Sequence, residues 1–246
     1  MAALSPTLRR TLGVYAMVSA SIFGVTRFEA MPTIGPYVHL VVAAIFLLSA
    51  IALTRDDPAH YGLVLGGLLE PDHDGRPMGP LGLLDLGRAL CRAMPPALVE
   101  LAAAVGVAAV VFPLYAVGFW WWHGPSHDFS LRFPPDLVSV AMAQLVVVAL
   151  PEEAFFRGYL QTALRHWDPR RWRVLGVELA PGAWVLQAAM FALIHFLVEA
   201  HPARLAVFFP GLLFGWARAW RGGIGAPLAL HAMSNLYSEI LRRSWL

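Results

Sequence analysis

The sequence LVSVAMAQLVVVALPEEAFFR occupies Leu137–Arg157, where an apolar run ends in two adjacent glutamates followed closely by an arginine. Charged side chains at bilayer depth are costly and rare, so a cluster of them indicates a functional site. On a helix, Glu153 and Arg157 are i and i+4, so they share a face and can pair. Glu152 points about 100° away from Glu153. The spacing predicts one glutamate neutralised by the arginine and a second, Glu152, left free for chemistry.

The composition is that of a chain that crosses a membrane several times. Hydrophobic residues make up 58% of the 246 residues and charged residues only 14%, whereas soluble domains are about 25% charged. A spanning helix needs about 20 mainly apolar residues. We therefore expect an all-α fold: one polytopic transmembrane bundle over residues 1–246, with about seven helices (six to eight) around an enclosed polar active-site cavity. The predicted spans are Thr11–Phe28, Pro36–Leu53, Pro96–Trp120, Leu137–Leu164, Gly182–Glu199, Ala203–Trp220 and Ile224–Leu241.

The positions of the arginines predict the orientation. They gather in alternate loops and at the N-terminus, which favours a cytoplasmic N-terminus. The exceptions are Arg242 and Arg243, which an odd number of spans would place on the other side. Residues 54–95 are expected to form a cytoplasmic loop with an interfacial helix near Leu81–Met94. The acidic stretch 70–75 imitates half of a calcium loop but lacks the final glutamate, so we interpret it as a turn.

Two later apolar segments carry polar residues at helical spacing. The first contains FALIH, which places His195 within the segment; the second contains HAMSN and places His231 and Asn235 at i and i+4. With the glutamate segment, the chain reads EExxxR, FxxxH and HxxxN in order. Peptide hydrolysis requires an activated water and a stabilised oxyanion. The candidate roles are a general base for Glu152, water orientation or amine protonation for His195, oxyanion donation for His231 and Asn235, and support for Glu153 and Arg157.

The three motifs together resemble the CPBP family of intramembrane proteases, whose best-known members are the type II CAAX prenyl endopeptidases. The resemblance covers about residues 136–237 and implies that this region is the catalytic core. It implies endoproteolysis of a membrane-associated or lipid-anchored protein, near its C-terminus. A sorting or anchoring signal, as in the myxosortase-like branch, is one such substrate. The chain has no lysine, a composition associated with GC-rich bacterial genomes, so the expected location is the bacterial inner membrane. The small net charge of +2 gives no reason to expect a nucleic-acid partner.

Other functions and a metal stay open from the sequence. Each motif alone has a structural explanation, since polar side chains also bridge helices in membranes. One alternative function is a non-catalytic scaffold or immunity protein. Another is a small proton-coupled transporter with Glu152 in a relay, although no duplicated halves are visible. Glu152, His195 and His231 supply one carboxylate and two imidazoles, a candidate set for a divalent metal such as zinc. A metal-free glutamate mechanism is slightly favoured.

Overall fold

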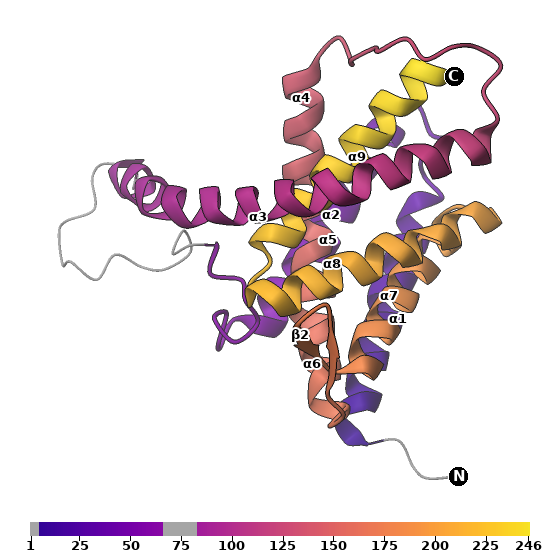
Figure 1. The fold of residues 1–246 in the computed structure, drawn as a ribbon. Coiled ribbons are helices and arrows are strands. Elements are labelled where there is room, and N and C mark those ends of the chain that lie inside the picture. Colours follow the sequence, from indigo (N-terminus) through magenta and orange to yellow (C-terminus); the bar gives the residue numbers. More distant parts are fainter. Residues whose placement is uncertain (1–4, 66–82) are drawn as a thin grey trace.

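The described part of the chain folds as an all-α bundle with one small hairpin, as predicted for a polytopic membrane protein (Figure 1). The computed structural model describes residues 5–65 and 83–246, with only the backbone of 83–86. The acidic stretch at 70–75 lies outside these residues. The main helices are α1 (Pro6–Thr26), α2 (Val38–Thr54), α3 (Leu83–His123), a segmented helix from Leu137 to Trp167, α7 (Pro181–Val198), α8 (Phe208–Arg221) and α9 (Gly225–Trp245), with short 3₁₀ turns η1 (Gly35–Tyr37) and η6 (Pro202–Val207).

Four helical segments within the described residues are long and apolar enough to cross a membrane. They are Gly35–Thr54, Gly87–His123, Leu137–Trp167 and Pro181–Val198. These correspond to four of the seven predicted spans. At 14 residues, α8 is shorter than the predicted span Ala203–Trp220, because the chain before it forms the 3₁₀ turn η6.

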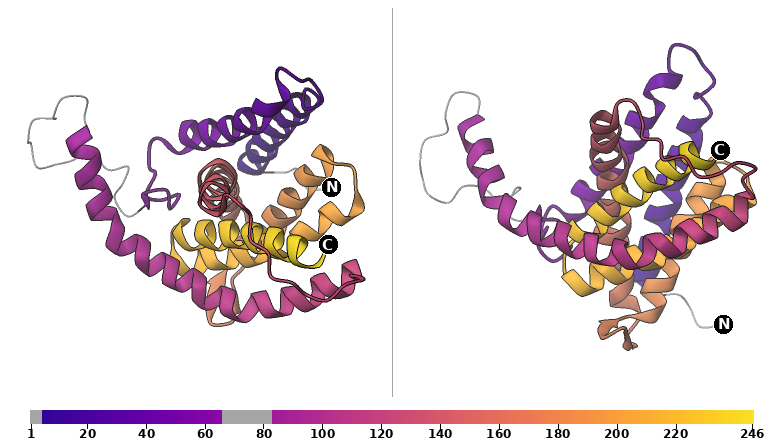
Figure 2. Two further views of the ribbon diagram at one scale, coloured as in Figure 1. Left: turned by 90° about the horizontal axis from the view of Figure 1, so that it is seen from above. Right: turned by 45° about the horizontal axis from the view of Figure 1, so that its top comes forward.

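The segmented helix lies in the centre of the bundle. Seen end-on, it stands between α1 and α2 on one side and α8, α9 and α3 on the other (Figure 2, left). It runs through α4 (Leu137–Met142), η4 (Ala143–Ala149), α5 (Leu150–Glu153), η5 (Ala154–Leu160) and α6 (Gln161–Trp167), of which η4 and η5 are π-helical turns. Such wide turns are rare and often lie at functional sites. Here they flank the short α5, which carries both glutamates.

Helix α3 differs from the sequence expectation. The loop was predicted to extend to residue 95, yet one helix runs unbroken from Leu83 to His123 with Pro95 and Pro96 inside it. Its first part, predicted to be a separate interfacial helix, extends away from the bundle (Figure 1). The exposed face further along α3 is apolar, with Val110, Leu114 and Val117 each at least 67% exposed. This face is suited to contact with lipid.

Helices α7 and α8 approach each other closely through two glycines. Gly211 and Gly215 lie one turn apart on α8, the spacing of the small-residue motif that lets membrane helices pack tightly. A Cβ at Gly211 would lie 3.3 Å from Ala188, and one at Gly215 would lie 2.5 Å from the amide nitrogen of Gln187. The close approach brings the α8 backbone within hydrogen-bond reach of the polar side chains at the centre of the bundle.

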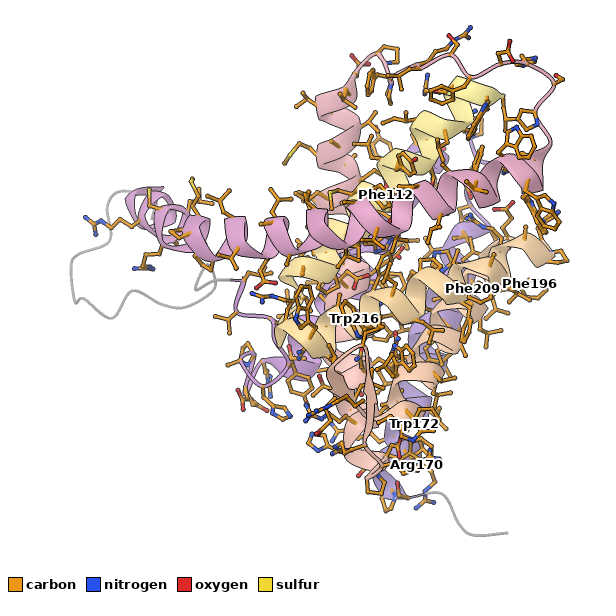
Figure 3. The ribbon with its side chains drawn as sticks, viewed as in Figure 1. Phe112, Arg170, Trp172, Phe196, Phe209 and Trp216 are labelled. Atoms are coloured by element: carbon orange, nitrogen blue, oxygen red, sulfur yellow. The ribbon has the colours of Figure 1, made fainter. Side chains whose placement is uncertain are left out.

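A short hairpin, absent from the sequence prediction, closes one end of the bundle. It pairs β1 (Trp172–Val174) with β2 (Val177–Leu179) in antiparallel register. Both turn residues, Leu175 and Gly176, have positive φ, as the tight turns of two-residue hairpins require. The indole of Trp216 on α8 donates to the Val174 carbonyl at 3.0 Å. Figure 3 shows Arg170 and Trp172 at this end of the bundle.

Candidate active site

Glu153 is the centre of a fully buried ion-paired cluster. Arg157 Nη1 donates to Glu153 Oε1 at 2.8 Å, and both side chains are 0% exposed. The pairing inferred from the i, i+4 spacing is therefore present. The Nδ1 atom of His231 lies 2.8 Å from the same Oε1. This contact links α9 to the central helix and was not predicted, since His231 was expected to serve the oxyanion.

Aromatic rings enclose the arginine and the histidine of this cluster. The guanidinium carbon of Arg157 lies 4.3 Å from the centre of the Phe191 ring and 5.1 Å from that of Phe214. The Phe214 ring also stacks on His231 at 4.8 Å. Cation–π contacts gain strength when they are desolvated. Phe191 and Phe214 thus help to hold a buried charge that would otherwise be unstable in the bundle.

Gln187 completes the support of this cluster and was missed in the sequence. Its Nε2 donates to the Gly211 carbonyl at 3.0 Å, and Arg157 Nη2 approaches the same oxygen at 3.4 Å. The Gly211 carbonyl is accessible to both because α8 packs closely on α7. The available signal was a single amide in the apolar segment 181–198, since polar side chains there commonly join helices.

Glu152 differs from its neighbour because its carboxylate has no hydrogen-bond partner among the described residues, whereas Glu153 leaves only its Oε2 unpaired and binds Arg157 and His231 through Oε1. Oε2 of Glu152 is buried and unpaired within the described residues, and it lies 3.8 Å from Nε2 of His231. That separation is too long for a hydrogen bond but short enough for one water to touch both atoms. Glu152 also lines a cavity of about 220 Å³ between the central helix and the paired ends of α1 and α2, with Thr26, Val38, His39 and Val198 among the other lining residues.

The hydrogen-bond partners of the two histidines fix their tautomers. Nδ1 of His195 lies 2.8 Å from the Phe191 carbonyl, which can only accept, so Nδ1 carries the proton. Nδ1 of His231 faces Oε1 of Glu153, the oxygen that also accepts from Arg157, so it too is the donor. With Nδ1 as the donor, Nε2 is the nitrogen of each ring that remains to accept a hydrogen bond. The Phe191 ring contacts both histidines, with its centre 4.5 Å from that of the His195 ring and 5.9 Å from that of the His231 ring.

Asn235 meets a partner that the sequence did not suggest. Its Nδ2 donates to Oε1 of Gln144 on η4 at 2.9 Å. One of its two N–H groups is thus already used, and the predicted oxyanion donor is half of an amide pair. Gln144 was missed although it is the lone amide in the apolar run Leu137–Leu150, where a polar group is itself a signal.

The residues proposed as metal ligands do not form a recognisable metal centre. Within residues 5–65 and 83–246, no group of three or more His, Cys, Asp or Glu side chains has an arrangement that could hold an ion. In the candidate set, only Glu152 and His231 form a close contact, at 3.8 Å. These three residues therefore do not form a three-ligand zinc site in the part of the chain that the structure describes. Metal dependence stays a prediction.

The region that holds all three motifs matches a known family. The family described as Type II CAAX prenyl endopeptidase Rce1-like matches residues 134–237. The resemblance predicted from the motifs is confirmed over this range, which begins just before the central helix and ends within α9. The match supports an intramembrane endopeptidase of the CAAX type, with a membrane-associated protein as its substrate. Neither the curated proteins nor the solved structures give a significant match to the chain.

Proposed function

We propose that the chain is an intramembrane endopeptidase that uses Glu152 to activate water against a peptide bond near the C-terminus of a membrane-anchored protein. The observation that supports this most directly is the buried, unpaired Oε2 of Glu152, 3.8 Å from the bare Nε2 of His231. A water held between these two acceptors would direct both of its protons toward them. Its oxygen lone pairs would then be free to attack a carbonyl carbon.

The reaction would proceed in two proton transfers. Glu152 takes a proton from the water as the hydroxide adds to the scissile carbonyl. The amide pair of Asn235 and Gln144 supplies N–H donors for the oxyanion. Glu152 then passes this proton, through the bare Nε2 of His195, to the departing amine as the carbon–nitrogen bond breaks and the oxyanion collapses to the carboxyl product. Glu153 and Arg157 do no chemistry here but hold His231 with its Nε2 directed at Glu152.

No step of this scheme requires a bound metal ion. We therefore expect peptide cleavage by the purified protein to persist after treatment with EDTA. We further propose that the N-terminus is cytoplasmic, in keeping with the arginine distribution. The membrane would be a bacterial inner membrane, and the substrate a protein with a C-terminal sorting or anchoring signal.

The decisive experiment compares the C-termini of membrane proteins in cells that make the wild-type chain or the Glu152→Gln variant. Glu152→Gln keeps the shape of the side chain and removes the base. Glu199→Gln is a matched control, because Glu199 is 61% exposed at the end of α7. We expect at least one membrane protein to keep its full C-terminus only with Glu152→Gln, while the two variants insert in equal amounts.

Two outcomes would contradict the proposal. If Glu152→Gln leaves every C-terminus processed, Glu152 is not the base. If no protein is cleaved even by the wild type, the chain is a scaffold or a transporter. A proton flux into vesicles that is lost with Glu152→Gln would identify the transporter.

A further inference from the structure

A second, larger cavity lies at the end of the bundle that the hairpin closes. Its volume is about 690 Å³, and it is bounded by α6, the chain that leads into the hairpin, the start of α7 and the end of α8. Arg165, Arg171, Arg218, His60 and His166 line it, with one carboxylate, Glu178. None of these residues belongs to the glutamate cluster, and none has a role in the proposed cleavage.

The cationic groups of this cavity outnumber the anionic ones. Glu178 is already engaged by Arg171 at 3.8 Å. The Nε2 atoms of His60 and His166 lie 3.1 Å apart, so one ring donates to the other. Arg165 and Arg218 have no ion pair or hydrogen bond to any described residue, and Nε of Arg218 is buried without a partner. Two guanidinium groups therefore lie unneutralised in one cavity.

The two free arginines also repel each other. Arg165 is the charged group that acts on Arg218, and the charge has the same sign. Both residues lie in the last turn of a helix, where the helix dipole favours a cation. The helix dipole explains why a cation is favoured at the end of α6 and, separately, at the end of α8. It does not account for two arginines placed around one cavity without a counter-ion.

The position of the cavity indicates which anion would enter it. The central candidate span ends at Trp167 and the next begins at Pro181. The lining residues between them therefore lie where a membrane span meets water, at the depth of lipid headgroups. Arginine is suited to phosphate because its guanidinium donates in a planar fork. Basic pockets between helices at this depth are typical binding sites for anionic headgroups.

We propose that this cavity binds a phosphate group carried by an anionic phospholipid, through Arg165 and Arg218. The bound headgroup would neutralise the two guanidinium groups and join α6 to α8 at this end of the bundle. The proposal is independent of the protease reaction, because the cavity shares no lining residue with the one at Glu152.

The test measures lipid retention by the purified full-length chain in native mass spectrometry. Phosphatidylglycerol or phosphatidylcholine is added to the wild type, to Arg165→Gln/Arg218→Gln and to Arg242→Gln/Arg243→Gln. The last double variant removes the same charge at the other end of the chain, where both arginines contact Glu239. We expect the wild type and this control to prefer phosphatidylglycerol. Each arginine removed from the cavity should weaken its binding about tenfold.

The single variant Arg165→Gln is tested as well, in case Arg218 is needed for folding. Arg165 is exposed, and replacing it breaks no ion pair with a described residue. Inorganic phosphate, added as a competitor, separates the two sources of the anion. Displacement of phosphatidylglycerol by millimolar phosphate would support a shared phosphate site. Equal retention of phosphatidylglycerol by the wild type and both cavity variants would overturn the proposal. So would binding of free phosphate with no preference between the two lipids.

Discussion

The central helix carries charged side chains at two levels, and the two groups differ in how their charges are matched. In its middle, Glu153 and Arg157 are wholly buried and paired with each other. At its end, Arg165 lies in a cavity with Arg218, and neither has a partner in the described part of the chain. A charge buried among apolar helices must be paired, whereas Arg165, at the end of the span, is exposed to water. An unmatched charge is tolerated near water and is there free to bind a ligand.

Glu152 is the exception to this contrast. It lies beside the paired cluster, yet its whole carboxylate lacks a hydrogen-bond partner in the described part of the chain, whereas Glu153 is paired through Oε1. The Glu152 side chain is 14% exposed, which gives it a partial route to water through the cavity it lines. An unpaired carboxylate in the buried part of the helix is costly. Here the unpaired carboxylate lies 3.8 Å from Nε2 of His231. A carboxylate and an imidazole nitrogen at this separation indicate a catalytic role for Glu152 more than a packing role.

Glu153→Ala should produce the largest loss of stability. It leaves Arg157 buried without its carboxylate and removes the partner of His231, at a cost of about 3–5 kcal/mol. Thermal unfolding of the purified protein and its abundance in the membrane measure the loss. The control is Arg242→Ala, which breaks an exposed pair worth at most about 1 kcal/mol. Similar unfolding temperatures for the two variants would remove the distinction between buried and exposed charges.

Much of the fold and part of the site could be predicted from the sequence. The apolar segments and the i, i+4 spacing were sufficient for the helical bundle and for the Glu153–Arg157 pair, because both depend on local periodicity. The contacts of His231 with Glu153 and of Asn235 with Gln144 depend on how α9 packs against the central helix. No local pattern encodes that packing. The unbroken α3 was missed because Pro95 and Pro96 normally end a helix.

The arginines at the C-terminus show a similar limit. Arg242 and Arg243 conflicted with the orientation predicted from arginine counts. Both contact Glu239, at 2.9 and 2.6 Å. Their charge is therefore partly neutralised within the helix itself. Counting arginines alone could not detect this local pairing.

Asn235→Ala should lower the rate of cleavage by about 10²–10³ if its amide serves the oxyanion. Gln144→Ala should cause a loss of similar size, because each amide orients the other. The rate of peptide cleavage and the unfolding temperature are measured together on each variant. A helix-bridging role instead predicts a stability loss of about 1 kcal/mol with the rate preserved. That result would mean that Asn235 and Gln144 stabilise the contact between two helices, as Glu153 and Arg157 do, and take no part in cleavage.

Asp168→Asn tests a paired charge at the end of the bundle that also holds the unpaired arginines. The Asp168 carboxylate is 1% exposed, pairs with Arg170 at 2.8 Å and accepts from the Gly182 amide at the start of α7. An asparagine removes the charge and one acceptor. Hydrogen bonds to charged groups are worth about 1.5–3 kcal/mol, so a loss in that range is expected at pH 7. Asp56→Asn, at a side chain that is 95% exposed, should change little.

The pH dependence of that loss separates the charge from the shape of the side chain. Burial raises the pKa of Asp168, but the hydrogen bonds from Arg170 and Gly182 outweigh it, so the pKa lies below its ordinary value. A lowered pKa means that the carboxylate contributes its full stability above the unfolded value of about 3.9. That contribution is lost as the pH falls through the folded pKa. The difference in unfolding temperature between wild type and Asp168→Asn should therefore be constant from about pH 5 to 8. It should become smaller as the pH falls below about 4. A gap that persists at low pH would mean that Asp168 acts through packing, and that paired charges at this end of the bundle contribute little.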